Sequence, residues 1–464
     1  MSKGLEELLF SGGDERIELK DTGVNKYHVN PCVYRGLLLR GSCTCNPLNS
    51  FSDPALREKF LGDNVDFISI REEQRVRISK LFNYENEDKF DLIFAPSGSD
   101  LPYLPLIFSK FLNPNKDIKL LLTCPEELGS GSQLAFLGKN YSHKVQFGNS
   151  SGITEDINPH YNISLERFMA RATNGDIIDN KKAIEADIEN ENNKKVIGAL
   201  VIGSKSGIED DISVIPDVSD EVLWTVDLCQ LRNSKKLVND LLDKGCLVMI
   251  TGSKFYMSPP FCGALLIPKK FSADLNKVNV EKVKHFTDGF KKVFSKYDFP
   301  NDWKNIRSLF NDNHNDGLVV RWEAALELME RFDDLPMDVS KKIIFDWNNV
   351  VRTKIRGSKH FVLMPQQDKT NQTIVSFKVK HSNGEFLDYT QLKEFHQKIT
   401  YNPFVFEKFK NVIIGQPVKY SNGAFLRLAI GAYNIIKIAG KAPKDQFTVD
   451  VKLIEHMEEL LKNK

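Results

Sequence analysis

The stretch 247–255 ends an apolar run with side chains that could do chemistry. It reads Leu-Val-Met-Ile-Thr-Gly-Ser-Lys-Phe, which places Thr251, Gly252 and Ser253 directly before Lys254. A lysine amine is nucleophilic only when it is unprotonated, and a partly desolvated site near another positive group favours that form. A lysine at the end of a buried strand, beside two hydroxyls, therefore suits a residue that forms a Schiff base next to a phosphate group. A surface lysine that follows a strand fits this stretch equally well.

A second stretch, 94–102, combines a strand end, a turn of small residues and a helix start. Ser97, Gly98 and Ser99 make the turn, and Pro102 falls in the first turn of the expected helix. The N-H groups at a helix N-terminus bind anions, and serine hydroxyls add further donors. The turn is therefore a candidate phosphate cradle, although ordinary helix capping uses the same residue types.

A carboxylate stands at the end of another expected strand. Asp227 directly follows the apolar segment 222–226. Ligands of α/β proteins bind at the carboxyl ends of parallel strands, and an aspartate there could keep a pyridine nitrogen protonated. An N-cap or surface aspartate is the equally weighted alternative.

Four polar sites follow four expected strands in one order: the turn 97–99, the turn 204–207, Asp227, and Lys254 27 residues later. This order and spacing resemble the fold type I pyridoxal phosphate-dependent enzymes, specifically the class V aminotransferase and cysteine desulfurase-like superfamily. The matching motifs extend from about residue 51 to residue 268. In that group a lysine forms the Schiff base, an aspartate pairs with the pyridine nitrogen, and small polar turns bind the phosphate and the ring oxygen.

The resemblance implies roles for residues of this chain and the cofactor pyridoxal 5'-phosphate. Lys254 and Asp227 take the two catalytic positions, and Gln230 or the turn 204–207 approaches the ring oxygen. The implied cofactor-binding residues are Ser97, Gly98, Ser99, Ser204, Gln230, Thr251 and Ser253.

A late segment, 425–431, resembles the family strand whose arginine binds the substrate carboxylate. Its planar guanidinium can donate two parallel hydrogen bonds to a carboxylate. Alternation along the strand places Arg427 opposite Leu426 and Leu428, which is consistent with one apolar face and one cavity face. An arginine paired on the sheet surface is the alternative, and Arg321 is a less certain second candidate.

The chain departs from the family pattern in two places. Relatives often stack an aromatic or histidine ring on the cofactor, but segment 123–132 contains neither, and Glu126 or Glu127 could cover the ring instead. A cysteine desulfurase needs a mobile cysteine well after its lysine, and no cysteine follows Cys262. Persulfide chemistry of that type is therefore disfavoured.

The N-terminal segment and the cysteines carry weaker signals. Relatives often line the substrate entrance with their N-terminal arm, so Arg40 and Asn46 deserve a test, although a capping loop is the more probable reading. The cysteines are odd in number and scattered, which indicates reduced thiols and no structural zinc site. They are Cys32, Cys43, Cys45, Cys124, Cys229, Cys246 and Cys262.

Composition excludes several classes of partner. The chain has 464 residues and a net charge of +1, so no overall field attracts nucleic acid or an anionic membrane. No uncharged apolar run approaches the roughly 20 residues of a membrane span, and no N-terminal signal is evident. We expect a cytoplasmic protein.

Strand and helix signals alternate through the first two thirds of the chain, which predicts an α/β fold: a three-layer sandwich with a mostly parallel central sheet. The clearest helix spans 234–244, and the polar stretch 179–195 suggests an insertion or an exposed helix. We expect an N-terminal arm at 1–50, a large cofactor-binding domain at 51–275, and a helical connection with a small α+β domain at 276–464.

The expected function is a pyridoxal phosphate-dependent aminotransferase or carbon-heteroatom lyase that acts on the α-amino group of a small amino acid. The resemblance implies a homodimer with shared active sites. A decarboxylase or racemase of the same fold is an alternative, and so is a phosphate- or nucleotide-binding α/β protein without imine chemistry. That rival lacks the glycine-rich dinucleotide fingerprint and the P-loop lysine. A degenerate relative serving as a scaffold is disfavoured because Asp227 and Lys254 occur together.

Overall fold

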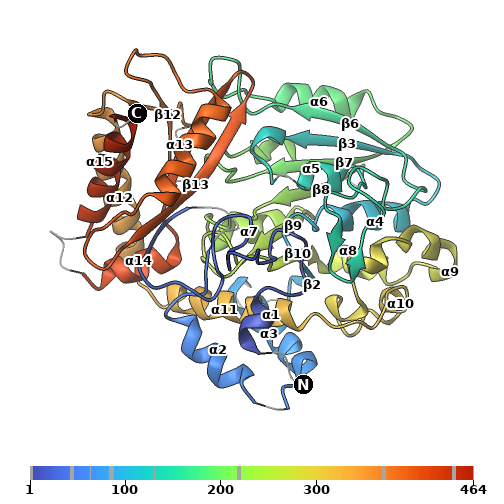
Figure 1. Cartoon of the computed structure of the whole chain (residues 1–464). Coiled ribbons are helices and arrows are strands. Elements are labelled where there is room, and N and C mark those ends of the chain that lie inside the picture. The colour runs from blue at the N-terminus through green and yellow to red at the C-terminus, as the bar shows by residue number, and fades with distance from the viewer. Residues whose placement is uncertain are drawn as a thin grey trace.

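The computed structural model describes residues 4–41, 46–62, 64–82, 88–129, 131–216, 221–367, 372–441 and 446–462. Its largest element is a seven-stranded sheet (Figure 1). In spatial order the strands are β2 (Phe90–Ala95), β10 (Gly263–Pro268), β9 (Leu247–Thr251), β8 (Val222–Asp227), β7 (Lys195–Val201), β3 (Ile118–Thr123) and β6 (Ile163–Phe168).

Only β10 runs against the other strands of this sheet. It pairs antiparallel with both β2 and β9, whereas the pairs β9–β8, β8–β7, β7–β3 and β3–β6 are parallel. The carboxyl ends of β2, β8 and β9 consequently meet at one edge of the sheet. The segments that follow these strands contain most of the residues singled out by the sequence.

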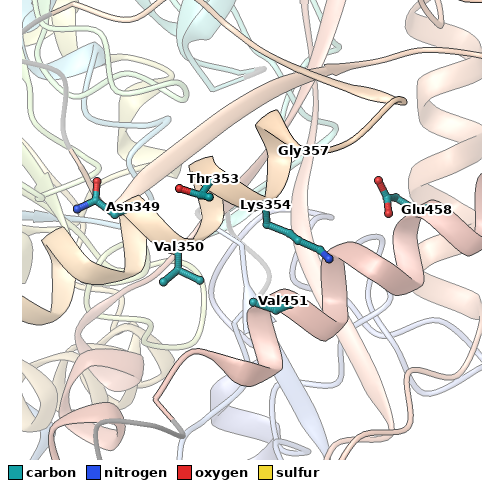
Figure 2. A pocket seen from close by; sticks show the side chains of 7 residues that line it. All are labelled: Asn349, Val350, Thr353, Lys354, Gly357, Val451 and Glu458. Atoms are coloured by element: carbon teal, nitrogen blue, oxygen red, sulfur yellow. The ribbon is translucent and has the colours of Figure 1, made fainter.

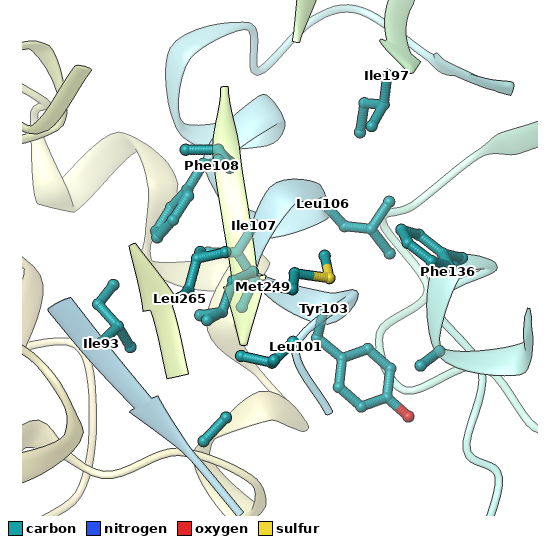
Figure 3. Close-up of a cluster of buried hydrophobic side chains, with 14 of the residues drawn as sticks. Ile93, Leu101, Tyr103, Leu106, Ile107, Phe108, Phe136, Ile197, Met249 and Leu265 are labelled. Atoms are coloured by element: carbon teal, nitrogen blue, oxygen red, sulfur yellow. The ribbon is translucent and has the colours of Figure 1, made fainter. Parts of the chain in front are cut away.

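Helices cover both faces of the sheet, which explains why its strands are continuous apolar runs. In β9, Leu247 and Met249 join one buried cluster, while Val248 and Ile250 join the cluster on the opposite face. Figure 3 shows the first cluster, where α4 (Tyr103–Leu112) packs against the strands. The second is covered by α3 (Phe67–Phe82), α7 (Lys235–Asp243) and α11 (Asp316–Asp333). The predicted α/β sandwich is confirmed.

Local sequence signals explain the helix bounds where a cap is present. Ser234 accepts a hydrogen bond from the N-H of Leu237 at the start of α7, and Gly245 follows its end with a φ of +80°. A left-handed residue ends a helix at low cost only when it is glycine. The helix predicted over 234–244 is therefore confirmed to within one residue at each end.

The polar region 150–195 contains one element that the sequence did not predict. The expected exposed helix is α6 (Lys181–Glu189), in which only Ile184 is buried. The strand β6, by contrast, was missed. It lies at the sheet edge with Glu166 and Arg167 exposed, so it lacks the apolar run of the central strands.

A second, five-stranded sheet lies beside the first (Figure 1). Its spatial order is β1 (Leu37–Arg40), β13 (Asn411–Tyr420), β14 (Gly423–Ala429), β12 (Ile374–Val379) and β11 (Phe361–Leu363). It packs with α12 (Met337–Arg356), α13 (Tyr389–Tyr401), α14 (Ala432–Ala439) and α15 (Thr448–Lys462) around one core. The strand β1 pairs parallel with β13, so the N-terminal segment is built into this sheet.

The remaining elements are short. They are α1 (Leu5–Leu9), α2 (Ser52–Phe60), α5 (Ser132–Phe136), β4 (Lys144–Val145), β5 (Gly148–Asn149), α8 (Lys269–Leu275), α9 (Val280–Val283), α10 (Lys304–Arg307) and the 3-10 turns η1 (Pro125–Glu127), η2 (Ile212–Val214), η3 (Lys284–Thr287), η4 (Phe290–Lys292) and η5 (Lys296–Asp298). Both α11 and the segment before it pack on the first sheet, although they follow residue 275. The division into 1–50, 51–275 and 276–464 stays a prediction. None of the helices in the described ranges is long and apolar enough to cross a membrane.

Candidate active site

One cavity of about 220 Å³ lies at the sheet edge where β2, β8 and β9 end. It brings together the ten residues to which the family resemblance gave a catalytic, cofactor-binding or carboxylate-binding role. Those residues are Ser97, Gly98, Ser99, Ser204, Asp227, Gln230, Thr251, Ser253, Lys254 and Arg427. The N-terminal segment contributes Arg16 and Tyr27 to the same walls, and the second sheet contributes Gln416 as well as Arg427.

A larger cavity of about 480 Å³ lies elsewhere, between α12 and α15 (Figure 2). Its lysine, Lys354, points toward α15 and forms an ion pair with Glu455 at 2.8 Å. None of the strand ends of the first sheet contributes to its lining. Size alone therefore does not identify the reactive site, and the smaller cavity holds the groups that could do chemistry.

Lys254 and Asp227 are electrostatically coupled in the smaller cavity. Asp227 is the last residue of β8, and its Oδ1 accepts a hydrogen bond of 2.8 Å from the N-H of Cys229. Burial raises the pKa of Asp227, whereas that hydrogen bond and the positive charges of Lys254 and Lys205 oppose the rise. The site thus holds a carboxylate whose charge depends on nearby cations.

The loop that carries Lys254 is fixed from two sides. Asn46 donates a hydrogen bond of 2.9 Å from Nδ2 to the carbonyl of Ser253, and the Lys254 carbonyl accepts one of 3.1 Å from Met257, whose φ is +53°. Asn46, which the sequence placed at the substrate entrance, supports this loop and does not line the cavity.

The turn 97–99 packs tightly on the neighbouring strand ends. A Cβ added to Gly98 would lie 2.9 Å from Thr251 Cγ2 and 3.1 Å from Cys229 Sγ. Only a glycine lets the turn approach this closely. The turn consequently exposes its backbone to the cavity at the start of α4.

The hydroxyl groups of two predicted phosphate ligands donate their hydrogen bonds to other groups of the protein. Ser97 donates 2.7 Å to Asp100 Oδ2 while accepting from the N-H of Ser99, and Thr251 donates 2.7 Å to the carbonyl of Cys229. Burial raises the pKa of Asp100 to about 6, with hydrogen bonds from Tyr141 and Ser97 opposing the rise. The roles of Ser97 and Thr251 as phosphate ligands therefore stay predictions.

Arg16 is a residue of this site that the sequence analysis missed. Its Nη1 donates 3.1 Å to Ser99 Oγ and its Nη2 donates 3.3 Å to Ser97 Oγ. Asp14 holds the guanidinium by accepting from Nε and Nη2 at 2.9 and 2.5 Å. Nothing in the local sequence marks Arg16, because 81 residues separate it from Ser97.

A buried glutamate, Glu127, forms part of the cavity wall. Glu127 accepts hydrogen bonds from Ser204 Oγ, from the N-H and Oγ of Ser206, and from Arg171 Nε at 3.1 Å. It lines the cavity together with Leu128. Glu126 instead accepts from the backbone of Ala170 and does not line the cavity. Of the two glutamates considered, only Glu127 faces the site.

The turn after β7 and Gln230 occupy neighbouring parts of the wall. Ser204 Oγ accepts 3.0 Å from the N-H of Ile208 in addition to its bond with Glu127. Gln230 Oε1 accepts 3.3 Å from Arg232 Nε. Both side chains line the cavity, and which of them approaches a ring oxygen stays a prediction.

Arg427 is buried on the cavity face of β14. Leu426 and Leu428 lie in the core of the second sheet, so the predicted alternation is confirmed. Arg427 Nη1 donates 3.1 Å to the carbonyl of Gln416. Its positive charge, together with burial as the larger effect, lowers the pKa of the nearby Arg232 to about 9. An anionic substrate group would relieve the repulsion between the two arginines.

The side chains of two other arginines considered from the sequence are bound within the fold, away from the cavity. Arg321 is fully buried and donates to the carbonyls of Phe261 at 2.8 Å and Ser11 at 2.7 Å. Arg40 pairs with Asp450 at 2.5 Å. Neither lines the cavity, so their positions do not support Arg321 as a second carboxylate ligand or Arg40 as an entrance residue.

The thiols of the described residues do not form a reactive cluster. Burial raises the pKa of Cys229, the one cysteine that lines the cavity, well above its ordinary value. A thiol held in this protonated form is a poor nucleophile. No group of three or more His, Cys, Asp or Glu suited to a metal occurs in the described ranges, and Cys43 and Cys45 lie outside them.

Comparison with known proteins identifies the fold. No protein-family model matches the chain, and no curated protein matches it significantly. The cysteine desulfurase CsdA of Escherichia coli superposes with a TM-score of 0.56 at 12% identity, covering 91% of this chain and 94% of the other. Ureidoglycine-glyoxylate aminotransferase of Bacillus subtilis gives 0.55 at 11%, covering 93% and 99%.

A third structure agrees with these two. Phosphoserine aminotransferase of Cytophaga hutchinsonii superposes with a TM-score of 0.53 at 14% identity, covering 93% of this chain and 99% of its own. The similarity extends over nearly the whole chain in each case. The chain therefore shares the fold of these three proteins, and the three-layer α/β architecture expected from the sequence is confirmed.

Proposed function

We propose that this chain is a pyridoxal phosphate-dependent enzyme that acts on the amino group of a small amino acid. The observation that carries the proposal is the presence of Lys254 and Asp227 in one cavity, beside the turn 97–99 at the start of α4. Proteins that share the fold include two aminotransferases and a cysteine desulfurase, which supports the same chemistry here.

The residues present fit this cofactor. Gly98 lines the cavity with backbone atoms alone, and the Ser99 hydroxyl beside it can donate a hydrogen bond to a phosphate. Asp227 offers a carboxylate to a protonated ring nitrogen, and Lys254 offers an amine for covalent attachment. Pyridoxal phosphate, when bound, supplies an electron sink for a bond broken at the substrate α-carbon.

Lys254 and Asp227 would divide the proton chemistry. When it is not attached to the cofactor, the amine of Lys254 would remove a proton from the substrate α-carbon and return one as a general acid. Asp227 would hold a proton on the pyridine nitrogen of the cofactor. The cations beside Asp227 favour its charged carboxylate form, which stabilises a protonated nitrogen. Each role requires a heavy-atom distance of about 3 Å in the loaded enzyme.

Arg427 and the cavity volume would select the substrate. The guanidinium can bind an α-carboxylate through two parallel hydrogen bonds. The cavity of about 220 Å³ would have to hold the cofactor as well as the substrate, so we propose a small amino acid as the substrate. We further propose a homodimer with shared active sites, as the family resemblance implies.

Transamination and elimination are both compatible with these residues, and a decarboxylase or racemase is the runner-up. A cysteine desulfurase is disfavoured, because the sequence has no cysteine after Cys262. A phosphate-binding protein without covalent chemistry is the rival from another class. Turn 97–99 and Arg16 would serve it equally well.

Trapping with borohydride tests the proposal. Purified protein is mixed with pyridoxal phosphate, and its visible absorbance is recorded before and after reduction. We expect a visible band that borohydride bleaches, and a pyridoxyl mass on the peptide that contains Lys254. Lys254→Ala should show neither, whereas Lys205→Ala, which removes another lysine of the same cavity, should keep both. Colourless protein, or a label on Lys205, contradicts the proposal.

Incubation of the loaded protein with single amino acids then identifies the reaction. Release of a keto acid only when an acceptor keto acid is present indicates transamination. Ammonia or sulfide release without an acceptor indicates a lyase, and carbon dioxide release indicates a decarboxylase.

A further inference from the structure

We propose that Arg16, held by Asp14, binds the cofactor phosphate from the N-terminal segment. The inference rests on the proposed function. It adds a phosphate-binding residue from outside the motifs that follow the strands of the large sheet. Arg16 lines the cavity and contacts both serines of the turn 97–99. It lies far from that turn in the sequence and reaches it only in the folded chain.

The hydrogen-bond geometry leaves Arg16 with a donor to spare. A guanidinium carries five N-H donors in a fixed fork. The Nε hydrogen and one Nη2 hydrogen face Asp14, the second Nη2 hydrogen faces Ser97, and one Nη1 hydrogen faces Ser99. The other Nη1 hydrogen has no acceptor among the described residues, so it remains for an anion bound beside the turn.

Arg16 also orients Ser99 as a donor. Because Ser99 Oγ accepts from Arg16, its hydroxyl hydrogen is directed elsewhere, and no acceptor for it occurs in the described part of the chain. Ser97 differs, since its hydrogen is used by Asp100. One arginine N-H and one serine O-H are therefore available to an anion that binds beside this turn.

Burial and charge keep Arg16 ready for an anion. Arg16 and Asp14 are 7% and 4% exposed, and the guanidinium lies 5.0 Å from the ring centre of Phe261. Burial is the largest single effect and lowers the pKa of Arg16, but the charges of Asp14 and Tyr141 and the hydrogen bonds to Asp14 together raise it well above its ordinary value. The arginine consequently stays cationic in a site where Asp100 would otherwise repel a phosphate.

A purely structural role is the competing explanation, because Arg16 also anchors the N-terminal segment. The two explanations differ in their dependence on the phosphate group. A structural anchor affects pyridoxal phosphate and pyridoxal alike, since the two aldehydes differ only in the phosphate. A phosphate-binding residue affects the first ligand far more than the second.

The test measures dissociation constants of both aldehydes for the full chain by visible absorbance. We expect Arg16→Gln to weaken pyridoxal phosphate by about ten- to a hundredfold, as for a lost charge-assisted hydrogen bond, and pyridoxal by less than about threefold. Arg40→Gln is the matched control. It removes another buried arginine of the N-terminal segment that pairs with an aspartate but does not line this cavity, and it should leave the affinity ratio unchanged.

Arg16→Gln leaves Asp14 buried without its partner, which could prevent folding. The double variant Asp14→Asn/Arg16→Gln removes both charges and should show the same loss of preference for the phosphorylated aldehyde. An unchanged ratio in either folded variant overturns the proposal, and so does an equal loss for both aldehydes. Wild-type protein that attaches neither aldehyde refutes the proposed function itself, and the inference falls with it.

Discussion

Gly415 lies directly opposite Arg427 in the β13–β14 ladder, and a Cβ at position 415 would lie 2.5 Å from Arg427 Cγ. The register of the ladder shifts between Gly415 and Val418, which marks a bulge beside the arginine. Bulges redirect side chains next to functional sites. Because Gly415 has no side chain and the bulge follows it, the Arg427 side chain can pack over position 415 and reach the cavity.

This relationship predicts the effect of Gly415→Ala. The added methyl group would displace the Arg427 side chain, so we expect the KM of the amino acid found in the substrate screen to rise by about tenfold or more. Affinity for pyridoxal phosphate should change by less than about twofold, because Arg427 does not contact the turn 97–99. Steady-state kinetics and an absorbance titration measure the two quantities.

Gly357→Ala is the control, because a Cβ there meets nothing closer than 3.6 Å and the residue has an ordinary φ of −74°. An unchanged KM in Gly415→Ala, with the variant folded, would show that Arg427 does not bind the substrate carboxylate.

Asp227→Asn should separate cofactor attachment from proton chemistry. The amide keeps the shape of the side chain but cannot favour a protonated ring nitrogen. We expect Lys254 to be trapped by borohydride as in the wild type, while exchange of the substrate α-proton slows by about a hundredfold or more. The exchange is followed by NMR in deuterated water. Glu126→Gln alters a carboxylate outside the cavity and should exchange at the wild-type rate.

Gly98→Ala should weaken the binding of pyridoxal phosphate. The new Cβ would collide with Thr251 and Cys229, which forces the turn away from the strand ends. A shift of even a few tenths of an ångström would misalign the Ser99 hydroxyl with a phosphate bound beside the turn, so we expect about a tenfold loss of affinity. Gly357→Ala again serves as the control. Equal affinity in both variants would place the phosphate elsewhere.

The sequence predicted the contents of this cavity well because the signals are local. Each of the residues 97–99, Asp227 and Lys254 follows a buried apolar strand, and parallel strands deliver their carboxyl ends to one edge. The alternation of Arg427 with Leu426 and Leu428 likewise predicted that Arg427 lies on the face of the strand opposite the apolar core. Periodicity and order along the chain are sufficient for such positions.

The rest of the site depends on contacts between distant segments, which no local pattern reveals. Arg16 reaches Ser99 across 83 residues, and Glu127 is held by Arg171 and by Ser206, 79 residues further on. The strand β1 joins the second sheet through β13, hundreds of residues later. Tertiary packing alone places these elements, so a single sequence contains no periodic signal for them.

Asp210 provides a prediction about stability and pH. It is partly buried beside Thr123 and accepts a hydrogen bond from the N-H of Val201 at 2.6 Å. Burial raises its pKa to about 6, against the opposing effect of these hydrogen bonds. A carboxyl whose pKa is raised on folding stabilises the protein below its unfolded pKa, and this contribution is lost as the pH rises through the folded value.

Asp210→Asn removes that titration. Its free energy of unfolding relative to the wild type should therefore increase by up to about 3 kcal/mol between about pH 4 and pH 7.5, from the difference between the two pKa values. Urea unfolding at several pH values measures this difference. Asp243→Asn, at an exposed position, should show no such trend. A relative stability of Asp210→Asn that stays constant or falls over this range would mean that Asp210 is already ionised at low pH in the folded protein.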